Sequence, residues 1–246
     1  MNRTVWPYPR WIAHRGAGKL APENTLAAFA LGARQGYRMF ECDVKLSQDG
    51  VPFLLHDTEL ERTSNGRGIA GDLPWSELAQ LDAGSWHSRQ YAGEPLPTMA
   101  NVARFCLRNN YFLNIEIKPS PGTGDTTGAV VADHAAQLWL ASEVPPLLTS
   151  FDVDALHAAR RAQPGLPRGL LLDAATEGWL ETAQALQCAA VVCNHRLWSA
   201  TTVAQAHAAG FHCLSYTVND DDAVRRLLDL GTDGIITDRV DLFAPA

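Results

Sequence analysis

The chain has 246 residues, of which 46% are hydrophobic and 19% charged, which is typical of a soluble globular protein and excludes a disordered or collagen-like chain. Twenty basic and 27 acidic residues give a formal net charge of −7, and no run is rich in lysine or arginine, so we predict no binding to nucleic acid. A chain of this length can bury a sizeable core, and α/β barrels routinely fill about 250 residues as one domain.

Short apolar runs alternate with helical patterns along the sequence. The runs predict strands over residues 11–15, 38–44, 52–56, 111–117, 146–150, 168–172, 189–194, 212–218 and 234–237. Helical patterns cover residues 24–35, 98–109, 128–140, 152–162, 177–186, 199–209 and 220–230. Strands that alternate with helices of about 10–15 residues favour βαβ units and a parallel sheet.

One strand breaks this alternation. Residues 52–56 follow residues 38–44 across Asp49-Gly50, a dipeptide that is a strong signal for a hairpin turn. We therefore interpret residues 52–56 as an antiparallel extension outside the main sheet. Eight strands remain, the number in a (β/α)8 TIM barrel, and this count favours an α/β barrel over the alternative of an open, doubly wound sheet.

Residues 57–97 do not fit a βα unit. They are rich in Gly, Ser, Trp and charged residues, with one short helical pattern near residues 75–81. A long excursion of this kind inside a compact domain is usually a functional insertion or a lid. We predict a single barrel domain over residues 1–246, with residues 57–97 as a short insertion after strand two that lies over the C-terminal face of the barrel.

Polar residues gather where predicted strands end. The sequences are His14-Arg15-Gly16, Glu41-Cys42-Asp43, His56-Asp57 and Glu116-Ile117-Lys118. Because side chains alternate along a strand, Glu41 shares a face with Asp43, and Glu116 shares one with Lys118. In a barrel that face can point inward, at the end where enzymes of this fold keep their active sites.

Three carboxylates at one strand end would repel one another unless a cation lay between them. The oxygen donors of Glu41, Asp43 and Glu116 favour a hard divalent ion, so we predict one divalent cation, Mg2+ or Ca2+, with Mn2+ also possible. The alternative is that each carboxylate forms a buried salt bridge, with Lys118 or Arg15 as the partner.

Two histidines close strands beside these carboxylates. His14 and His56 can act as general base and general acid near neutral pH. Arg15 and Lys118 add two cations, as expected around a phosphoryl group, so the set points to cleavage of a phosphate ester. The other histidines are interpreted as structural or surface residues: His87, His134, His157, His195, His207 and His212.

The five cysteines are odd in number, widely spaced and without a CxxC motif, which favours reduced, mostly buried thiols over a disulfide framework. Cys188, Cys193 and His195 lack the second cysteine pair of a usual zinc site, so we favour a structural role for them. No stretch approaches the roughly 20 apolar residues of a membrane span, and the first 16 residues lack the apolar segment of a signal peptide. We therefore predict a cytoplasmic protein.

An ordered set of motifs runs from about Pro7 to Asp241. It comprises His14-Arg15-Gly16, Pro22-Glu23-Asn24-Thr25, Glu41-Cys42-Asp43-Val44, His56-Asp57, Leu60-Glu61-Arg62-Thr63-Ser64-Asn65-Gly66, Leu81-Asp82-Ala83-Gly84-Ser85-Trp86, Leu96-Pro97-Thr98, Asn114-Ile115-Glu116-Ile117-Lys118-Pro119, Thr149-Ser150-Phe151, Tyr216-Thr217-Val218-Asn219 and Gly234-Ile235-Ile236-Thr237-Asp238. Together these motifs resemble the glycerophosphodiester phosphodiesterase family. The opening Trp6-Pro7-Tyr8-Pro9 and the short insertion resemble the cytoplasmic bacterial form.

This resemblance implies a TIM barrel that hydrolyses small glycerophosphodiesters, such as glycerophosphocholine and glycerophosphoethanolamine, to sn-glycerol 3-phosphate and an alcohol. It implies a metal at Glu41, Asp43 and Glu116, His14 as base and His56 as acid. Arg15 and Lys118 match phosphate-contacting positions. Tyr216 stands where many members have Trp and is expected to line the glycerol pocket, and Trp86 and Phe151 are interpreted as pocket walls.

Several alternatives stay open at this point. Glu23 either orients Arg15 or precedes a helix capped by Asn24 or Thr25. The nucleophile is either water or the 2-hydroxyl of the glycerol, which would give a cyclic phosphate. The competing functions are a non-catalytic phosphate-metabolite binder and a phospholipase-like relative acting at membranes, but the aromatic residues of the insertion are scattered among charges, which favours a water-soluble substrate and no membrane partner.

Overall fold

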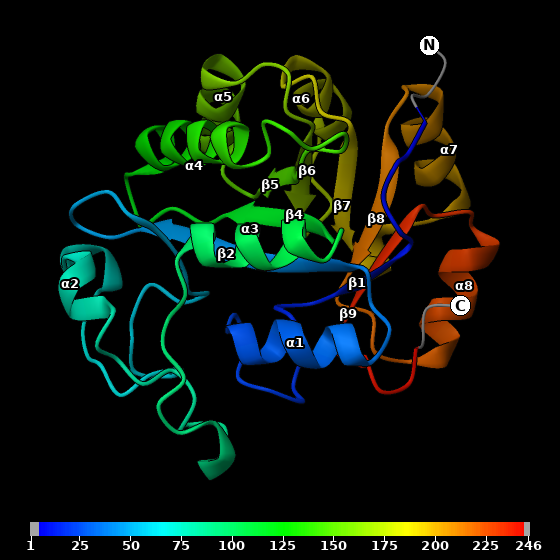
Figure 1. Ribbon diagram of the computed structural model, residues 1–246. Coiled ribbons are helices and arrows are strands. Elements are labelled where there is room, and N and C mark those ends of the chain that lie inside the picture. The colour runs from blue at the N-terminus through cyan, green and yellow to red at the C-terminus, as the bar shows by residue number, and fades with distance from the viewer. Residues whose placement is uncertain (1–4, 244–246) are drawn as a thin grey trace.

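Eight parallel strands close into a barrel in the computed structural model, which describes residues 5–243 (Figure 1). They are β1 (Trp11–Ala13), β2 (Met39–Leu46), β4 (Phe112–Ile117), β5 (Leu147–Ser150), β6 (Arg168–Leu172), β7 (Ala190–Asn194), β8 (His212–Tyr216) and β9 (Gly234–Thr237). The first strand, β1, pairs with both β9 and β2, so the sheet has no gap. The predicted TIM barrel is therefore confirmed, and the open sheet is excluded.

The helices lie outside this barrel, between successive strands (Figure 1). They are α1 (Leu26–Arg34), α3 (Met99–Arg108), α4 (Gly124–Leu138), α5 (Val153–Ala162), α6 (Trp179–Ala185), α7 (Ala200–Ala208) and α8 (Asp221–Asp229). Five of them begin where a side-chain oxygen accepts a backbone N–H of the first turn: at Thr25, Thr98, Asp152, Ser199 and Asp220. Every predicted helix and strand is present.

The pleat of β2 separates an apolar layer from a polar one. Cys42 and Val44 pack in the large core cluster between the sheet and the helices, whereas Glu41 and Asp43 alternate with them and face the barrel axis. The opposite half of the interior is filled by apolar side chains from most strands: Ile12, Met39, Leu147, Leu171, Ala190, Val192, Leu214 and Ile236. Charged groups inside the barrel are thus gathered at its C-terminal end.

The hairpin prediction is also confirmed. β3 (Pro52–Leu54) runs antiparallel to β2, with Val44 opposite Leu54. The insertion that follows contains α2 (Trp75–Leu78) and the short 3-10 helices η1 (Ala70–Asp72) and η2 (Arg89–Tyr91).

The insertion has an apolar cluster of its own, made by Phe53, Leu55, Leu60, Ala70, Leu78, Ala83 and Leu96. It lies beside α1, next to the C-terminal end of β2 (Figure 1). There Glu94 Oε1 accepts the backbone N–H of Ala27 at 3.0 Å, and His87 Nε2 lies 3.0 Å from the carbonyl oxygen of Lys19. The insertion thus contacts both the loop between β1 and α1, at Lys19, and the first turn of α1, at Ala27. The division of the whole chain into one domain stays a prediction.

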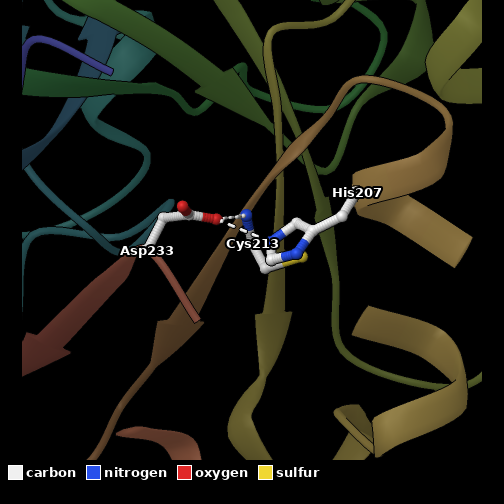
Figure 2. A group of neighbouring side chains, drawn as sticks. All are labelled: His207, Cys213 and Asp233. Atoms are coloured by element: carbon white, nitrogen blue, oxygen red, sulfur yellow. Dashed lines mark hydrogen bonds and ion pairs between the residues drawn. The ribbon is translucent and has the colours of Figure 1, made fainter. Parts of the chain in front are cut away.

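A second polar cluster lies at the opposite end of the barrel, where β8 and β9 begin (Figure 2). Asp233 Oδ2 accepts the backbone N–H of Cys213 at 2.8 Å and lies 3.0 Å from His207 Nε2, while His212 Nδ1 lies 3.4 Å from Asp233 Oδ1. These contacts join α7, β8 and the loop before β9. Their place at the end opposite the carboxylates agrees with a structural role.

All five cysteines are buried, and none of them is joined in a disulfide within the described residues. Within residues 5–243, Cys188, Cys193 and His195 do not form a group with metal-binding spacing. A separate 3-10 helix, η3 (His195–Leu197), begins at the last of these residues. No helix in this part of the chain is long and apolar enough to span a bilayer.

Candidate active site

The polar strand ends meet around a cavity of about 150 Å3 at the C-terminal end of the barrel. It is lined by His14, Arg15, Glu41, His56, Asn114, Glu116, Lys118, Thr149, Phe151, Leu171, Tyr216, Thr217 and Ile236. A larger cavity of about 370 Å3 lies elsewhere, lined mostly by apolar residues such as Trp179 and Trp198. Convergent charged groups mark the smaller cavity as the candidate active site.

Three carboxylates form one cluster at this site, and two of them, Glu41 and Glu116, line the cavity, whereas Asp43 lies beside them without lining it. Asp43 and Glu116 are opposite each other in the β2–β4 pairing, and each of Glu41, Asp43 and Glu116 offers an oxygen within 4.8 Å of the others. Glu41 Oε1 and Asp43 Oδ1 are buried and accept no hydrogen bond from the described residues. Buried carboxylate oxygens without donors, arranged around one point, fit a hard divalent cation.

Two basic side chains partly compensate this negative charge. Arg15 Nε lies 3.2 Å from Asp43 Oδ2, and Lys118 Nζ lies 2.8 Å from Glu116 Oε1 and 3.5 Å from Asp43 Oδ1. The salt bridges that the sequence left open as an alternative are therefore present for two of the carboxylates. Glu41 has a weaker set of partners, because it accepts the backbone N–H of Arg15 at 3.0 Å and lies 3.8 Å from His14. If all three carboxylates were ionised, the charges of Arg15 and Lys118 would not balance them, and the cluster would carry a net negative charge.

The pKa values of the three carboxyl groups diverge. Burial raises the pKa of Glu41, and the charge of Asp43 raises it further; the same two causes raise the pKa of Glu116. Burial would also raise the pKa of Asp43, but Arg15 and Lys118 outweigh it and hold that pKa below its ordinary value. Without a cation, the cluster thus retains a proton at pH values where isolated carboxyl groups have lost theirs.

We expect the affinity of the cluster for Mg2+ to rise with pH between about pH 6 and 8. A cation must displace the proton held by the raised pKa of Glu41 or Glu116, so the affinity changes by up to about tenfold per pH unit for each proton released. Isothermal titration calorimetry of Mg2+ at three pH values, in two buffers of different ionisation enthalpy, measures both the affinity and the proton release. A pH-independent affinity with no buffer effect would contradict this prediction.

His14 is held by a partner that the sequence analysis did not assign. Its Nδ1 lies 2.6 Å from Asp238 Oδ1, and Asp238 Oδ2 accepts a hydrogen bond from Asn219 Nδ2 at 2.9 Å. Burial would lower the pKa of His14, but the hydrogen bond to Asp238 and the charge of Glu41 raise it overall. Asp238 directly follows β9. A polar residue at the end of a predicted strand was the signal that indicated His14, Glu116 and Lys118, and it was available for Asp238 as well.

His56 lies on the opposite side, where β3 leads into the insertion. Its Nδ1 lies 2.7 Å from Asp57 Oδ1. Burial lowers the pKa of His56, and Arg15 and Lys118 lower it further against the raising effect of Asp43. In the cation-free protein the pKa values of His14 and His56 are therefore shifted in opposite directions, toward a protonated His14 and a neutral His56.

The loop after β1 supports the acidic cluster. Thr25, and not Asn24, caps α1, because the Thr25 hydroxyl accepts the N–H of Ala28. Asn24 instead donates from Nδ2 to Asp43 Oδ2 at 2.8 Å and accepts the backbone N–H of Asp43 at 3.1 Å, with a left-handed φ of 59°. Glu23 Oε1 accepts a hydrogen bond from Arg15 Nη1 at 2.8 Å, so the structure favours its orienting role.

Lys45 is a buried residue that the sequence analysis missed. It follows Glu41 and Asp43 on the inward face of β2, and its Nζ donates to the carbonyl oxygens of His56 and Lys118 at 3.1 and 3.3 Å. Burial lowers the pKa of Lys45 to about 8. Its period-two spacing from Asp43 was the available signal. Lys45 ties together the strand ends that carry His56 and Lys118.

Two of the three predicted pocket aromatics line the cavity. The rings of Phe151 and Tyr216 meet edge to face at 5.8 Å, and the Tyr216 hydroxyl donates to the carbonyl oxygen of Leu172 at 3.1 Å. Trp86 lies in the insertion, where its Nε1 donates to the carbonyl oxygen of Ala83, and it is not among the residues that line this cavity. The structure therefore brings together every predicted site residue except Trp86.

Comparisons with known proteins give a consistent result. The model of the "Glycerophosphoryl diester phosphodiesterase family" matches residues 14–242. A glycerophosphodiester phosphodiesterase of Caldanaerobacter subterraneus is 31% identical over 92% of this chain and 93% of its own length. Among solved structures, an Oleispira antarctica phosphodiesterase in complex with its product sn-glycerol-3-phosphate has a TM-score of 0.87 and 35% identity, over 94% of this chain and 93% of that one. A glycerophosphodiester phosphodiesterase of Agrobacterium tumefaciens has a TM-score of 0.80 and 26% identity, over 97% and 100% of the two chains.

Proposed function

Because the chain belongs to the glycerophosphoryl diester phosphodiesterase family, we propose that it hydrolyses glycerophosphodiesters such as glycerophosphocholine and glycerophosphoethanolamine to sn-glycerol 3-phosphate and an alcohol. One observation carries the proposal: two carboxylates, Glu41 and Glu116, line a single cavity together with two basic side chains and two histidines, and Asp43 has an oxygen within 4.8 Å of theirs. The product named for the Oleispira antarctica relative supports sn-glycerol 3-phosphate as the product here.

A divalent cation completes the proposed site. Glu41, Asp43 and Glu116 would hold one Mg2+ or Ca2+, with Mn2+ as a further candidate, and their oxygen donors fit such an ion. When bound, the cation would act as a Lewis acid that increases the electrophilicity of the phosphorus. Arg15 and Lys118 lie beside these carboxylates and bind the phosphoryl oxygens, where their charges stabilise the negative charge of the transition state.

His14 and His56 transfer the protons in this proposal. Asp238 accepts from Nδ1 of His14, which leaves Nε2, 3.8 Å from Glu41, free to take a proton from the nucleophile. Asp57 fixes Nδ1 of His56 in the same way, so Nε2 can protonate the departing alcohol oxygen. These roles, His14 as base and His56 as acid, are those that the family resemblance implies.

The directions of the two pKa shifts bear on these roles. In the cation-free protein the pKa of His14 is raised in part by Glu41, and a cation bound to that carboxylate would remove this contribution. The pKa of His56 is lowered by burial and by Arg15 and Lys118, and an anionic phosphodiester beside these cations offsets their effect. A bound cation would thus act to lower the pKa of His14 and a bound phosphodiester to raise the pKa of His56, each in the direction that the proposed role requires.

The remaining parts of the proposal concern the walls of the substrate pocket and the location of the protein in the cell. Phe151 and Tyr216 form walls of the substrate pocket, whereas Trp86, which does not line the cavity, has no part in the proposed pocket. A cytoplasmic location is supported by the five buried cysteines, none of which forms a disulfide within the described residues, as suits a reducing compartment.

The test is release of sn-glycerol 3-phosphate from glycerophosphocholine and glycerophosphoethanolamine, with EDTA and then with added Mg2+ or Ca2+. Cation-dependent release from both substrates is expected. No release with any cation would reject the proposal in favour of a non-catalytic binder or a phospholipase-like enzyme, which lysophosphatidylcholine as a third substrate distinguishes. Phosphorus NMR during turnover shows whether a cyclic phosphate forms, which identifies the glycerol 2-hydroxyl as nucleophile in place of water.

A further inference from the structure

A chain of ion pairs connects His56 to Arg15 through the insertion. Arg62 Nε donates to Asp57 Oδ2 at 2.5 Å and its Nη2 to Asp57 Oδ1 at 3.0 Å, and Asp57 in turn contacts His56. Both terminal nitrogens of Arg62 also donate to Glu23, at 2.8 Å each, and Glu23 in turn contacts Arg15. One guanidinium therefore binds two carboxylates, and each carboxylate reaches a different residue of the site.

We propose that Arg62 is a positioning residue for the reaction. It fixes Asp57, which orients the imidazole of His56, and Glu23, which orients the guanidinium of Arg15. Arg62 thereby couples protonation of the leaving group and binding of the phosphoryl group to the insertion. This inference rests on the function proposed above.

The geometry sets Arg62 apart from an ordinary surface ion pair. Exposed pairs stabilise proteins by about 0–1 kcal/mol because water screens them and side-chain order is costly. The Arg62 side chain is 45% exposed, but the side chain of Glu23 is only 13% exposed. Glu23 forms ion pairs with two arginines, Arg15 and Arg62. A planar fork that makes two bonds to each of two carboxylates is a geometry that lysine cannot reproduce.

Electrostatics point the same way. The hydrogen bond from Arg62 holds the pKa of Asp57 below its ordinary value. Burial would raise the pKa of Glu23, but the hydrogen bond from Arg62 and the charge of Arg15 hold it down. Both carboxylates thus stay ionised while they orient His56 and Arg15. Without Arg62, each would lose its bidentate partner and be held only by its contact with His56 or Arg15, which constrains its orientation less.

The backbone around Arg62 is built to hold it. Leu60, two residues before it, is fully buried in the apolar cluster of the insertion, and its N–H donates to the carbonyl oxygen of Gly68. Ser64, two residues after it, donates from its hydroxyl to the carbonyl oxygen of Leu60 at 2.7 Å. Arg62 therefore projects from an anchored turn, which suits a positioning residue.

The test compares two substrates with different leaving groups. Glycerophosphocholine releases an alcohol that needs a proton, whereas the p-nitrophenyl ester of glycerol 3-phosphate releases a phenolate that does not. For Arg62→Ala we expect kcat on glycerophosphocholine to fall about 10–100-fold and kcat on the nitrophenyl ester to fall clearly less, because that substrate loses only the contribution of Arg15 and needs no proton from His56, with KM raised for both. Guanidinium ion added to Arg62→Ala is expected to restore part of the loss.

Two further variants sharpen this result. Arg62→Lys keeps the charge without the fork, so its kcat on glycerophosphocholine is expected to stay near that of Arg62→Ala. Arg161→Ala breaks an exposed pair with Asp125 and is expected to match the unsubstituted protein. Equal losses on the two substrates, or full activity of Arg62→Lys, would overturn the positioning role, whereas an unsubstituted protein without any sn-glycerol 3-phosphate release would reject the proposed function instead.

One readout does not depend on turnover. The imidazole of His56 is faced by Asp57, Asp43, Arg15 and Lys118. Removal of Arg62 leaves the charge of Asp57 uncompensated, so NMR titration of Arg62→Ala is expected to show a higher pKa for His56 and an unchanged pKa for His14. An unchanged pKa for His56 would also overturn the proposal.

Discussion

Replacing His14 by alanine is expected to lower kcat by about 10²–10⁴-fold on every glycerophosphodiester, because the imidazole proposed to take the proton of the nucleophile is lost. Replacing His56 by alanine is expected to cause a loss of that size only on substrates whose leaving alcohol needs a proton. The p-nitrophenyl ester of glycerol 3-phosphate provides the contrast, since its phenolate leaves unprotonated.

The measurement is kcat for both variants on glycerophosphocholine and on the nitrophenyl ester, with the divalent cation at saturation. His134→Ala is the matched control, because His134 lies on α4, outside the candidate active site, and its Nδ1 lies 2.9 Å from the carbonyl oxygen of Val130 on the same helix. If His14→Ala spared the nitrophenyl ester and His56→Ala did not, the two roles would be exchanged. Near-normal kcat for either variant would remove that histidine from the mechanism.

Much of the fold follows from local patterns. The period-two alternation of Glu41-Cys42-Asp43-Val44 predicted two inward carboxylates, and the register of β2 on β4 brings Glu116 to them. Asp49-Gly50 predicted the hairpin that takes β3 out of the barrel. These features depend on neighbours in sequence and on a rule for where barrel enzymes place their polar residues, so one chain was enough to find them.

The supporting contacts could not be predicted in this way. His14 and Asp238 are separated by 224 residues, and Arg62 and Glu23 by 39. No local pattern indicates which carboxylate an imidazole or a guanidinium will meet, because closure of the barrel and docking of the insertion decide it. For Trp86 the sequence suggested a site role that the structure does not support. Its residue type suggested a pocket wall, but the fold of the insertion directs its indole nitrogen to the carbonyl oxygen of Ala83.

The charge balance of the site connects stability to function. Asp43 is paired with Arg15 and Lys118, so the charge of Asp43 stabilises the fold, whereas Glu41 is buried beside another carboxylate and its ionised form opposes folding. A group whose folded pKa is raised above its unfolded value costs stability as pH rises through that range. The cation-free protein should therefore be less stable at pH 8 than near neutral pH, unless Glu41 is replaced.

Glu41→Gln is accordingly expected to raise the unfolding midpoint of the cation-free protein at pH 8 while abolishing its response to Mg2+. At about 100 times the dissociation constant, Mg2+ should stabilise the unsubstituted protein by about 2.7 kcal/mol, or about 5–10 °C in Tm for a chain of this size. The variant lacks a ligand, so its Tm should move little with Mg2+, and release of sn-glycerol 3-phosphate should fall to the level seen with EDTA.

Asp43→Asn provides the opposite control. It leaves the buried charges of Arg15 and Lys118 without their carboxylate, so it should lower Tm in the cation-free protein as well as abolish the response to Mg2+. Thermal unfolding of both variants with EDTA and with Mg2+ separates the two contributions. An equal Mg2+-induced shift in Glu41→Gln and in the unsubstituted protein would show that Glu41 is not a ligand, and would leave its buried, unpaired oxygen to be explained by another partner.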